Sequence, residues 1–268
     1  MTASPARQRE PGRWSRYVAV GDSFTEGMSD EDPAAPDRFI GWADRLAAHL
    51  AVAVAQDFGY ANLAVRGRLL DDIVGRQLEE ALALRPDLVS IVGGGNDILR
   101  PRADIDGLAA RLEDAVARIR ATGADVLMAT PVDPREAPLV KMTRGRAATY
   151  VAHIWSIARR HEAFVIDQWG MHALRDWRLW ASDRIHMTTE GHRRVALNAF
   201  TTLGFRPDDT EWATPLPPAP PIGRADSFRE NVRWAREYVA PWVQRRLRGQ
   251  SSGDALTAKR PTITPFEG

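Results

Sequence analysis

Short apolar runs alternate with longer amphipathic segments along the first three quarters of the chain. The short runs end at glycines or charges, as buried parallel strands do, and the longer segments place apolar residues at helical spacing. The expected strands are 17–20, 56–63, 87–92, 124–129 and 163–167. The expected helices are 39–53, 69–84, 104–121, 144–161 and 188–203. This alternation predicts an α/β domain in which helices cover both faces of a parallel sheet of about five strands.

The pattern changes after residue 205. Five prolines between residues 215 and 221 predict a stiff, extended connector. The segment after the connector has helical spacing, and the polar residues at the end of the chain favour a disordered tail. The expected divisions are a disordered N-terminal arm 1–15, the α/β domain 16–205, a proline-rich connector 206–225, a C-terminal helix 226–248 and a disordered tail 249–268.

The expected C-terminal helix carries an aromatic stripe, and two interpretations of it are open. The stripe comprises Phe228, Trp234, Tyr238 and Trp242, and three arginines follow it. A cationic helix with aromatic residues on one side is typical of attachment to a membrane surface. We favour packing of the stripe on the α/β domain or on a second subunit, which leaves a homo-oligomer through this helix open.

The charge balance and the cysteine count exclude several classes of function. The chain has 268 residues, with 36 lysines and arginines against 35 aspartates and glutamates, so no strong field favours nucleic acid as a partner. The absence of cysteine excludes thiolate nucleophiles, zinc ribbons, iron–sulfur clusters and disulfides. The N-terminus lacks the apolar core of a secretory signal, and no apolar stretch is long enough to span a bilayer. We therefore expect a cytoplasmic protein without stable membrane insertion.

The strongest chemical motif is Gly-Asp-Ser-Phe-Thr-Glu-Gly at 21–27, directly after the first expected strand. A serine at a strand-to-helix turn presents its hydroxyl at the edge of the sheet, and its own backbone N–H is placed to help hold an oxyanion. Ser23 is therefore a candidate nucleophile. Because serine is also a common helix N-cap, the motif alone leaves a purely structural role open.

A second motif, Asp-Arg-Ile-His at 183–186, precedes the last expected helix. A serine hydroxyl needs a base to remove its proton, and the base needs a carboxylate on its other ring nitrogen. A separation of three residues on a loop allows Asp183 and His186 to supply these two groups. His192 falls inside the expected helix, and we expect it to be structural.

Two further loops follow expected strands and offer hydrogen-bond donors. Asn96, in Gly-Gly-Gly-Asn-Asp at 93–97, has a neutral amide suited to a developing oxyanion, and the N–H of Gly67 is another donor. The glycines do not form a phosphate-binding or dinucleotide-binding motif. Because ligands of parallel sheets bind beyond the carboxyl ends of the strands, we expect these loops to share one site with Ser23.

In these four blocks the sequence resembles the SGNH (GDSL-type) hydrolase family, whose blocks are carried by Ser, Gly, Asn and His. The matching positions are Ser23, Gly67, Asn96, and Asp183 with His186. The resemblance covers roughly residues 16–203. Phe24 stands where many members have Leu. Ala64 stands where many have Gly, so we expect the oxyanion loop to differ slightly in shape.

The resemblance implies a flavodoxin-like three-layer αβα sandwich and a serine hydrolase that cleaves carboxylic esters, small acyl or acetyl esters above all, through an acyl-enzyme on Ser23. His186 is expected to act as base and Asp183 to orient it. The N–H groups of Ser23 and Gly67 and the Asn96 amide are the expected oxyanion donors. The resemblance implies neither a metal nor an organic cofactor, and the expected partner is a small-molecule ester.

Two alternatives stay open at this point. An acyltransferase would use the same site and pass the acyl group to a sugar or alcohol acceptor. A non-catalytic ligand-binding protein would keep the fold without the chemistry, although the intact set of candidate residues argues against it. The loops 131–142 and 168–182 are expected to line the substrate pocket, and the second is rich in tryptophan.

Overall fold

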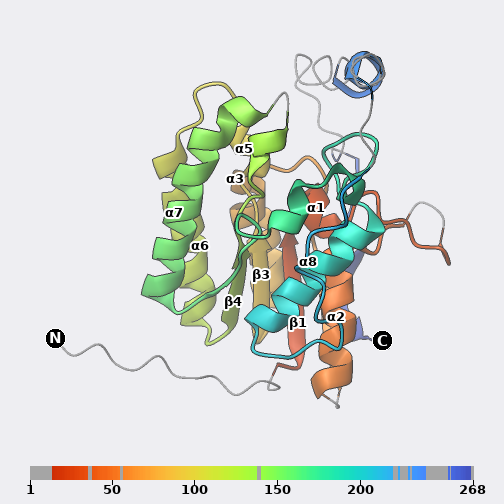
Figure 1. Ribbon diagram of the computed structural model, residues 1–268. Helices are drawn as coiled ribbons and strands as arrows, with labels where there is room; N and C mark the ends of the chain where they lie inside the picture. The colour runs from red at the N-terminus through yellow and green to blue at the C-terminus, as the bar shows by residue number, and fades with distance from the viewer. Residues whose placement is uncertain are drawn as a thin grey trace, which may run out of the picture.

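A mixed sheet lies between two layers of helices in the computed structural model, which describes residues 14–35, 38–54, 57–137, 140–219, 231–239 and 255–266, and residues 223, 229 and 253 (Figure 1). Six strands form the sheet within this part of the chain. Their bounds are β1 (Arg16–Gly21), β2 (Gly59–Asn62), β3 (Leu88–Val92), β4 (Asp125–Ala129), β5 (Phe164–Ile166) and β6 (Arg260–Pro265).

The strand order is β5-β4-β3-β1-β2-β6. The first five strands in the chain are parallel, and β6 runs antiparallel to β2. The parallel part has the flavodoxin-like order, so the predicted αβα sandwich is confirmed. In this order the chain changes direction at β1, and sheets of this kind bind ligands beyond the carboxyl ends of the strands at that point.

The helices appear close to where the sequence pattern predicts them. The α-helices are α1 (Ser23–Glu26), α2 (Gly41–Val54), α3 (Leu70–Asp72), α4 (Leu78–Ala83), α5 (Gly95–Ile98), α6 (Ile105–Ala121), α7 (Arg144–His161) and α8 (Thr189–Thr202). A π-helical segment, η1 (Ile73–Gln77), joins α3 to α4. Shorter helical segments are η2 (Pro134–Glu136), η3 (Lys141–Thr143), η4 (His172–Arg175), η5 (Trp177–Leu179) and the π-helical η6 (Ala235–Val239).

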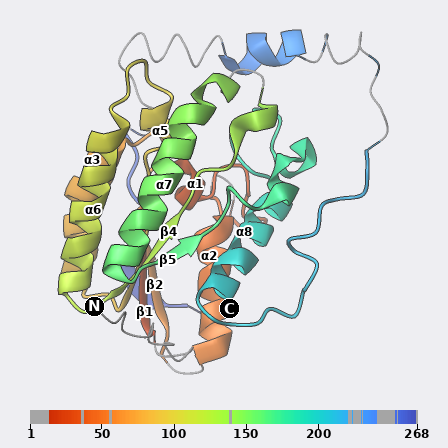
Figure 2. The same cartoon turned by 60° about the vertical axis from the view of Figure 1, so that its left-hand side comes forward.

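Each face of the sheet has its own hydrophobic core. Val18 and Val20 of β1 point to the face covered by α3–α4, α6 and α7 (Figures 1 and 2). Tyr17 and Ala19 point to the opposite face, which α2 and α8 cover. The strand is apolar at consecutive positions because both of its faces are buried, as in parallel sheets generally.

The two ends of the chain correct the predicted divisions. The predicted disordered arm is wrong for Trp14 and Ser15. Trp14 is 2% exposed and donates its indole N–H to Asp125 (3.0 Å), and Ser15 donates to the Asp87 carboxylate. Residues 1–13 lie outside the described residues.

The predicted disordered tail 249–268 is wrong for residues 260–265, because they form β6 and extend the sheet beyond β2. Of the predicted C-terminal helix 226–248, residues 231–239 are helical, and residues 240–248 lie outside the described residues. Among the residues that are described, no helix combines the length and the apolar character needed to cross a bilayer.

Candidate active site

The turn that carries Ser23 is fixed by side chains on both sides. Asp22 is the N-cap of α1, and its carboxylate accepts the backbone N–H of Phe24 (3.1 Å). The amide of Gln77 pairs with Gly21, accepting its N–H (2.9 Å) and donating to its carbonyl (3.0 Å). Ser23 is consequently held, half-buried, as the first residue of α1 at the carboxyl end of β1.

The amide of Asn96 connects this turn to the loop that carries Gly67. Its Nδ2 atom donates to the Asp22 carboxylate (3.2 Å) and to the carbonyl of Arg68 (3.1 Å). Gly67 precedes Arg68 in a turn and has a φ of 73°, a conformation that favours glycine. The structure therefore brings together the first three predicted blocks beyond the carboxyl ends of β1, β2 and β3.

Glu26, the last residue of α1, binds the loop of Gly67 from the other side. Its buried carboxylate accepts the backbone N–H of Arg66 (2.6 Å) and pairs with the Arg66 guanidinium. Ala64, the departure in the second block, is 1% exposed and donates its N–H to the side chain of Asn62 (3.1 Å). The loop is thus tied to α1 at one end and to the sheet at the other.

The surroundings of Asp22 shift the pKa of its carboxyl group. Burial raises the pKa of Asp22 to about 6, against the hydrogen bond from the Phe24 N–H and the electrostatic attraction of His186. His186 is thus among the groups whose charge acts on the nucleophile turn. The fourth predicted block follows β5, the last strand of the parallel series.

Asp183 and His186 form a close pair on their loop. The Asp183 carboxylate lies 2.6 Å from Nδ1 of His186 and also accepts the backbone N–H groups of Ile185 (2.9 Å) and His186 (3.0 Å). Burial pushes the pKa of Asp183 upward, but the bonds from His186 and Ile185 outweigh it and hold this pKa below its ordinary value. Because a carboxylate only accepts, Nδ1 carries the proton and Nε2 is left as the basic nitrogen.

His192 has a different environment. It is 1% exposed, accepts the N–H of Trp42 at Nδ1 (3.2 Å) and lies 3.2 Å from the carbonyl of Met28 through Nε2. Burial lowers the pKa of His192 to about 4, so the ring is neutral at pH 7. It joins α8 to α2 and the loop after α1, which is a structural arrangement.

The sequence matches the model of the GDSL-like Lipase/Acylhydrolase family over residues 19–194. The chain belongs to this family. The matched region contains all four blocks described above, and membership makes this GDSL-like protein a carboxylic ester hydrolase. No curated protein matches the chain.

Several solved structures share the fold of this GDSL-like hydrolase. Axe2, an acetylxylan esterase from Geobacillus stearothermophilus, has a TM-score of 0.59 at 20% identity, covering 72% of this chain and 95% of Axe2. LAE5, an alpha/beta hydrolase enzyme from the metagenome of Lake Arreo in Spain, has a TM-score of 0.59 at 23% identity, covering 71% and 95%. TesA has a TM-score of 0.58 at 22% identity, covering 70% and 97%. At these identities the likeness shows a common fold.

The C-terminal helical segment 231–239 contacts the loop of the Asp183–His186 pair in this GDSL-like hydrolase. Trp234 donates its indole N–H to the carbonyl of Asp183 (2.8 Å), and the Tyr238 hydroxyl lies 2.9 Å from the Ser182 hydroxyl. Both views place the segment beyond the carboxyl ends of the strands (Figures 1 and 2). No motif indicates this contact, because Trp234 is 51 residues from Asp183 along the chain.

A cavity of about 430 Å³ lies between the same loop and the C-terminal segment. Trp177 and Trp180 line it, and both belong to the loop 168–182 that the sequence predicts as part of the pocket. Arg184 also lines it, with its guanidinium 5.8 Å from the ring of Trp177 and 5.1 Å from that of Trp234. This side of the candidate site is therefore aromatic and cationic.

Proposed function

We propose that this GDSL-like hydrolase cleaves small acyl esters through an acyl-enzyme on Ser23, with His186 as the base and Asp183 as its orienting carboxylate. The observation that carries the proposal is the pair of Asp183 and His186, in which the carboxylate lies 2.6 Å from Nδ1 of the ring. The His186 ring also interacts electrostatically with Asp22, in the turn that holds Ser23. A serine with such a base and carboxylate has the three roles that nucleophilic acyl transfer requires.

The first step transfers the hydroxyl proton of Ser23 to Nε2 of His186 while the oxygen attacks the ester carbonyl. Asp183 holds the ring in the tautomer that exposes Nε2 and stabilises the imidazolium that forms. The pKa of Asp183 lies below its ordinary value, so this carboxylate is ionised at neutral pH. The protonated His186 then gives its proton to the leaving alcohol, and water releases the acyl group by the same steps in reverse order.

The tetrahedral oxyanion is proposed to bind the backbone N–H groups of Ser23 and Gly67 and the amide of Asn96. Without substrate, the Asn96 amide donates over 3.1–3.2 Å to Arg68 and Asp22. Both bonds are longer than the usual 2.9 Å, so a negatively charged oxygen competes well for one of these hydrogens. Donors that are held in place before the reaction stabilise the transition state without a reorganisation cost.

The substrate is proposed to be a short acyl ester, acetyl esters above all. One of the structural neighbours, Axe2, is an acetylxylan esterase, which supports an acetyl group on an alcohol of sugar type. The aromatic cavity beside the Asp183 loop suits stacking of a sugar ring or an aryl group, because tryptophan faces bury flat apolar surfaces.

The experiment is hydrolysis of p-nitrophenyl esters from acetate to palmitate by the wild type and Ser23→Ala. We expect the rate to be highest for the shortest chains and to fall to the uncatalysed rate in the variant. Activity that survives in Ser23→Ala would contradict the serine mechanism. Adding competing alcohols and analysing the products separates hydrolysis from acyl transfer, since a transferase forms a new ester with the added alcohol.

A further inference from the structure

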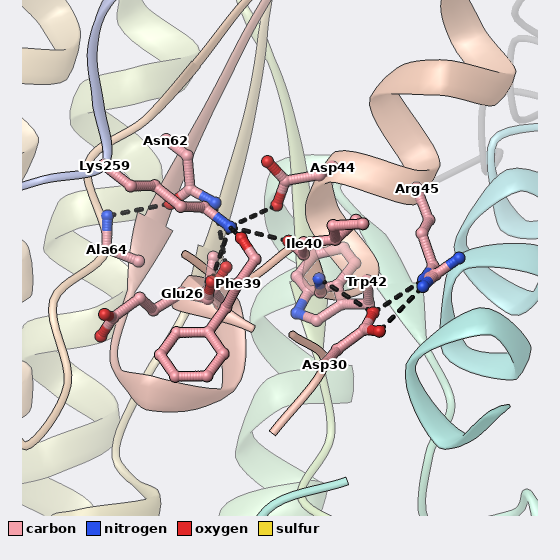
Figure 3. A network of polar contacts seen from close by, with 12 residues as sticks. Glu26, Asp30, Phe39, Ile40, Trp42, Asp44, Arg45, Asn62, Ala64 and Lys259 are labelled. Atoms are coloured by element: carbon pink, nitrogen blue, oxygen red, sulfur yellow. Dashed lines mark hydrogen bonds and ion pairs between the residues drawn. The ribbon is translucent and has the colours of Figure 1, made fainter. Parts of the chain in front are cut away.

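The chain beyond the matched family region returns to the nucleophile turn. Strand β6 pairs with β2, and the side chain of the residue just before it, Lys259, reaches toward α1 and the start of α2 (Figure 3). The Lys259 side chain is 12% exposed. A buried lysine is rare unless it is paired, because burial removes water from its charge. The groups around Lys259 must therefore compensate its charge.

Beside Lys259, the backbone after α1 crosses the backbone at the start of α2. Gly27 ends α1 with a φ of 95°, and Gly41 begins α2 with a φ of 79°. A Cβ atom on Gly27 would lie 2.6 Å from the Cα of Gly41, so side chains are excluded from both positions. Asp30 joins the two segments beside the crossing, because it accepts the N–H groups of Ile40 (2.8 Å) and Gly41 (3.1 Å).

Lys259 binds both segments as well. Its Nζ atom lies within hydrogen-bond distance of four oxygens, which share its three hydrogens: the carbonyls of Glu26 (2.6 Å), Phe39 (2.8 Å) and Ile40 (2.7 Å) and the Asp44 carboxylate (2.6 Å). The first carbonyl precedes Gly27 and the third precedes Gly41, so one ammonium spans the crossing (Figure 3). Each bond from a charged donor is stronger than one between neutral groups.

The effect extends to the loop of Gly67. Glu26 offers its carbonyl to Lys259 and its carboxylate to Arg66, the residue before Gly67. The same C-terminal segment touches this loop directly, because Arg68 donates to the carbonyl of Gly253 (3.2 Å). A Cβ atom on Gly253 would lie 2.1 Å from the Arg66 carbonyl oxygen, which shows how closely the two backbones approach.

We propose that Lys259 is a positioning residue for ester hydrolysis, because its ammonium fixes the C-terminal end of the four-residue helix that begins with Ser23. The proposal rests on the proposed function of Ser23. A helix of four residues is too short to absorb a shift at one end. A displacement of Glu26 therefore moves Ser23 and the Arg66–Gly67 loop together. Displacements of the order of 1 Å in a site cost about a hundredfold in rate.

The test uses the absence of cysteine from the natural sequence. Lys259→Cys is alkylated in denaturant with 2-bromoethylamine, which restores an ammonium at the end of a lysine-like side chain. A second portion is alkylated with 1-bromopropane, which gives a neutral side chain of the same length. Both products and the wild type are refolded in the same way. Diethyl p-nitrophenyl phosphate, run to completion, counts the reactive serines in each.

We expect the neutral side chain to lower kcat per titrated site for p-nitrophenyl acetate by at least about tenfold, with KM within about twofold of wild type. The aminoethyl side chain should restore most of kcat. Arg260→Met, at the neighbouring position, is the matched control. Arg260 stacks on Tyr60 and Phe266, so its loss is expected to change stability and to leave kcat per site unchanged.

Equal kcat per titrated site for the neutral and the aminoethyl side chains would overturn the proposal. So would a neutral product with no titratable site, since Lys259 would then serve folding alone. A refolded wild type that neither reacts with the phosphate triester nor hydrolyses the acetate would contradict the proposed function of Ser23 instead. The two failures are therefore distinguishable.

Discussion

Asp22 stands where three parts of the candidate site meet. One carboxylate oxygen accepts the N–H of Phe24 and so starts α1, and the other accepts from the amide of Asn96. The side chain is 8% exposed, and burial raises its pKa to about 6. The residue beside the proposed nucleophile therefore changes its charge within a pH range where the fold is expected to be intact.

The raised pKa of Asp22 predicts that the stability of the fold depends on pH. Between about pH 4 and 6 the folded protein holds a proton on Asp22 that the unfolded chain has lost, so the free energy of unfolding falls as pH rises through this window. The contribution is about 3 kcal/mol. Asp22→Asn keeps an oxygen for the Phe24 N–H but does not titrate. Urea unfolding at several pH values should show a shallower fall for the variant, and parallel curves would contradict the assignment.

The residues of the site differ in how far the sequence predicts them. Ser23 and the Asp183–His186 pair stand in short motifs, where the spacing itself gives the chemistry. Asn96 was predicted as an oxyanion donor, but not as a partner of Asp22, because 74 residues separate the two and no local pattern joins them. The role of Gln77 as a clamp on Gly21 was not predicted for the same reason, over 56 residues.

Among the elements, the C-terminal helical segment contacts the Asp183–His186 loop directly. Arg184, between the two candidate catalytic residues, has a φ of 57°. Non-glycine residues in this left-handed region pay an energetic cost of about 1–2 kcal/mol. Arg184 lies against Trp177 and Trp234 and donates to Asn231 (2.5 Å). These contacts offset the strain and hold the loop in its observed conformation.

Trp234→Phe tests this contribution. The ring that lies against Arg184 is largely retained, and the N–H that binds the Asp183 carbonyl is lost. A hydrogen bond of this kind contributes about 0.5–1.5 kcal/mol, so we expect kcat/KM for p-nitrophenyl acetate to fall by about two- to tenfold. Val232→Ala on the same segment is the control, since Val232 is 51% exposed. Equal values for the two variants would show that the loop does not depend on Trp234.

Most elements of the parallel sheet were predicted because their strands are buried on both faces and read as apolar runs. β6 was not, because its sequence, Arg-Pro-Thr-Ile-Thr-Pro, is mostly polar and contains two prolines. Proline is tolerated in edge strands, where one side of the backbone has no partner strand. Ile263 is the apolar residue of β6 that packs against the core.

For the whole molecule, β6 changes which strand forms the edge of the sheet. Without it, β2 would be the edge, and its four residues are all buried. Removing residues 253–268 would expose the backbone of β2 to pairing with other chains, a common cause of aggregation. Light scattering should therefore rise for the truncated chain at concentrations where the full chain is dispersed.

The control for truncation is Lys259→Met, which keeps β6 and loses only the ammonium. We expect this variant to remain as dispersed as the wild type. A truncated chain that stays monomeric with an unchanged melting temperature would show that β6 does not protect the sheet.

Lys259 and Glu26 are 233 residues apart, so their contact can form only after most of the chain has been synthesised. At translation rates of 5–20 residues per second, β6 emerges roughly 10–40 s after β2. In the second half of that interval, after β5 has emerged, the five parallel strands are outside the ribosome, with β2 unpaired on one side and the crossing at Gly27 without its ammonium. The nascent protein therefore passes through a stage that has every candidate catalytic side chain but lacks the contact of Lys259 with the nucleophile turn, and we expect its esterase activity to reach the full value only when the sixth strand arrives.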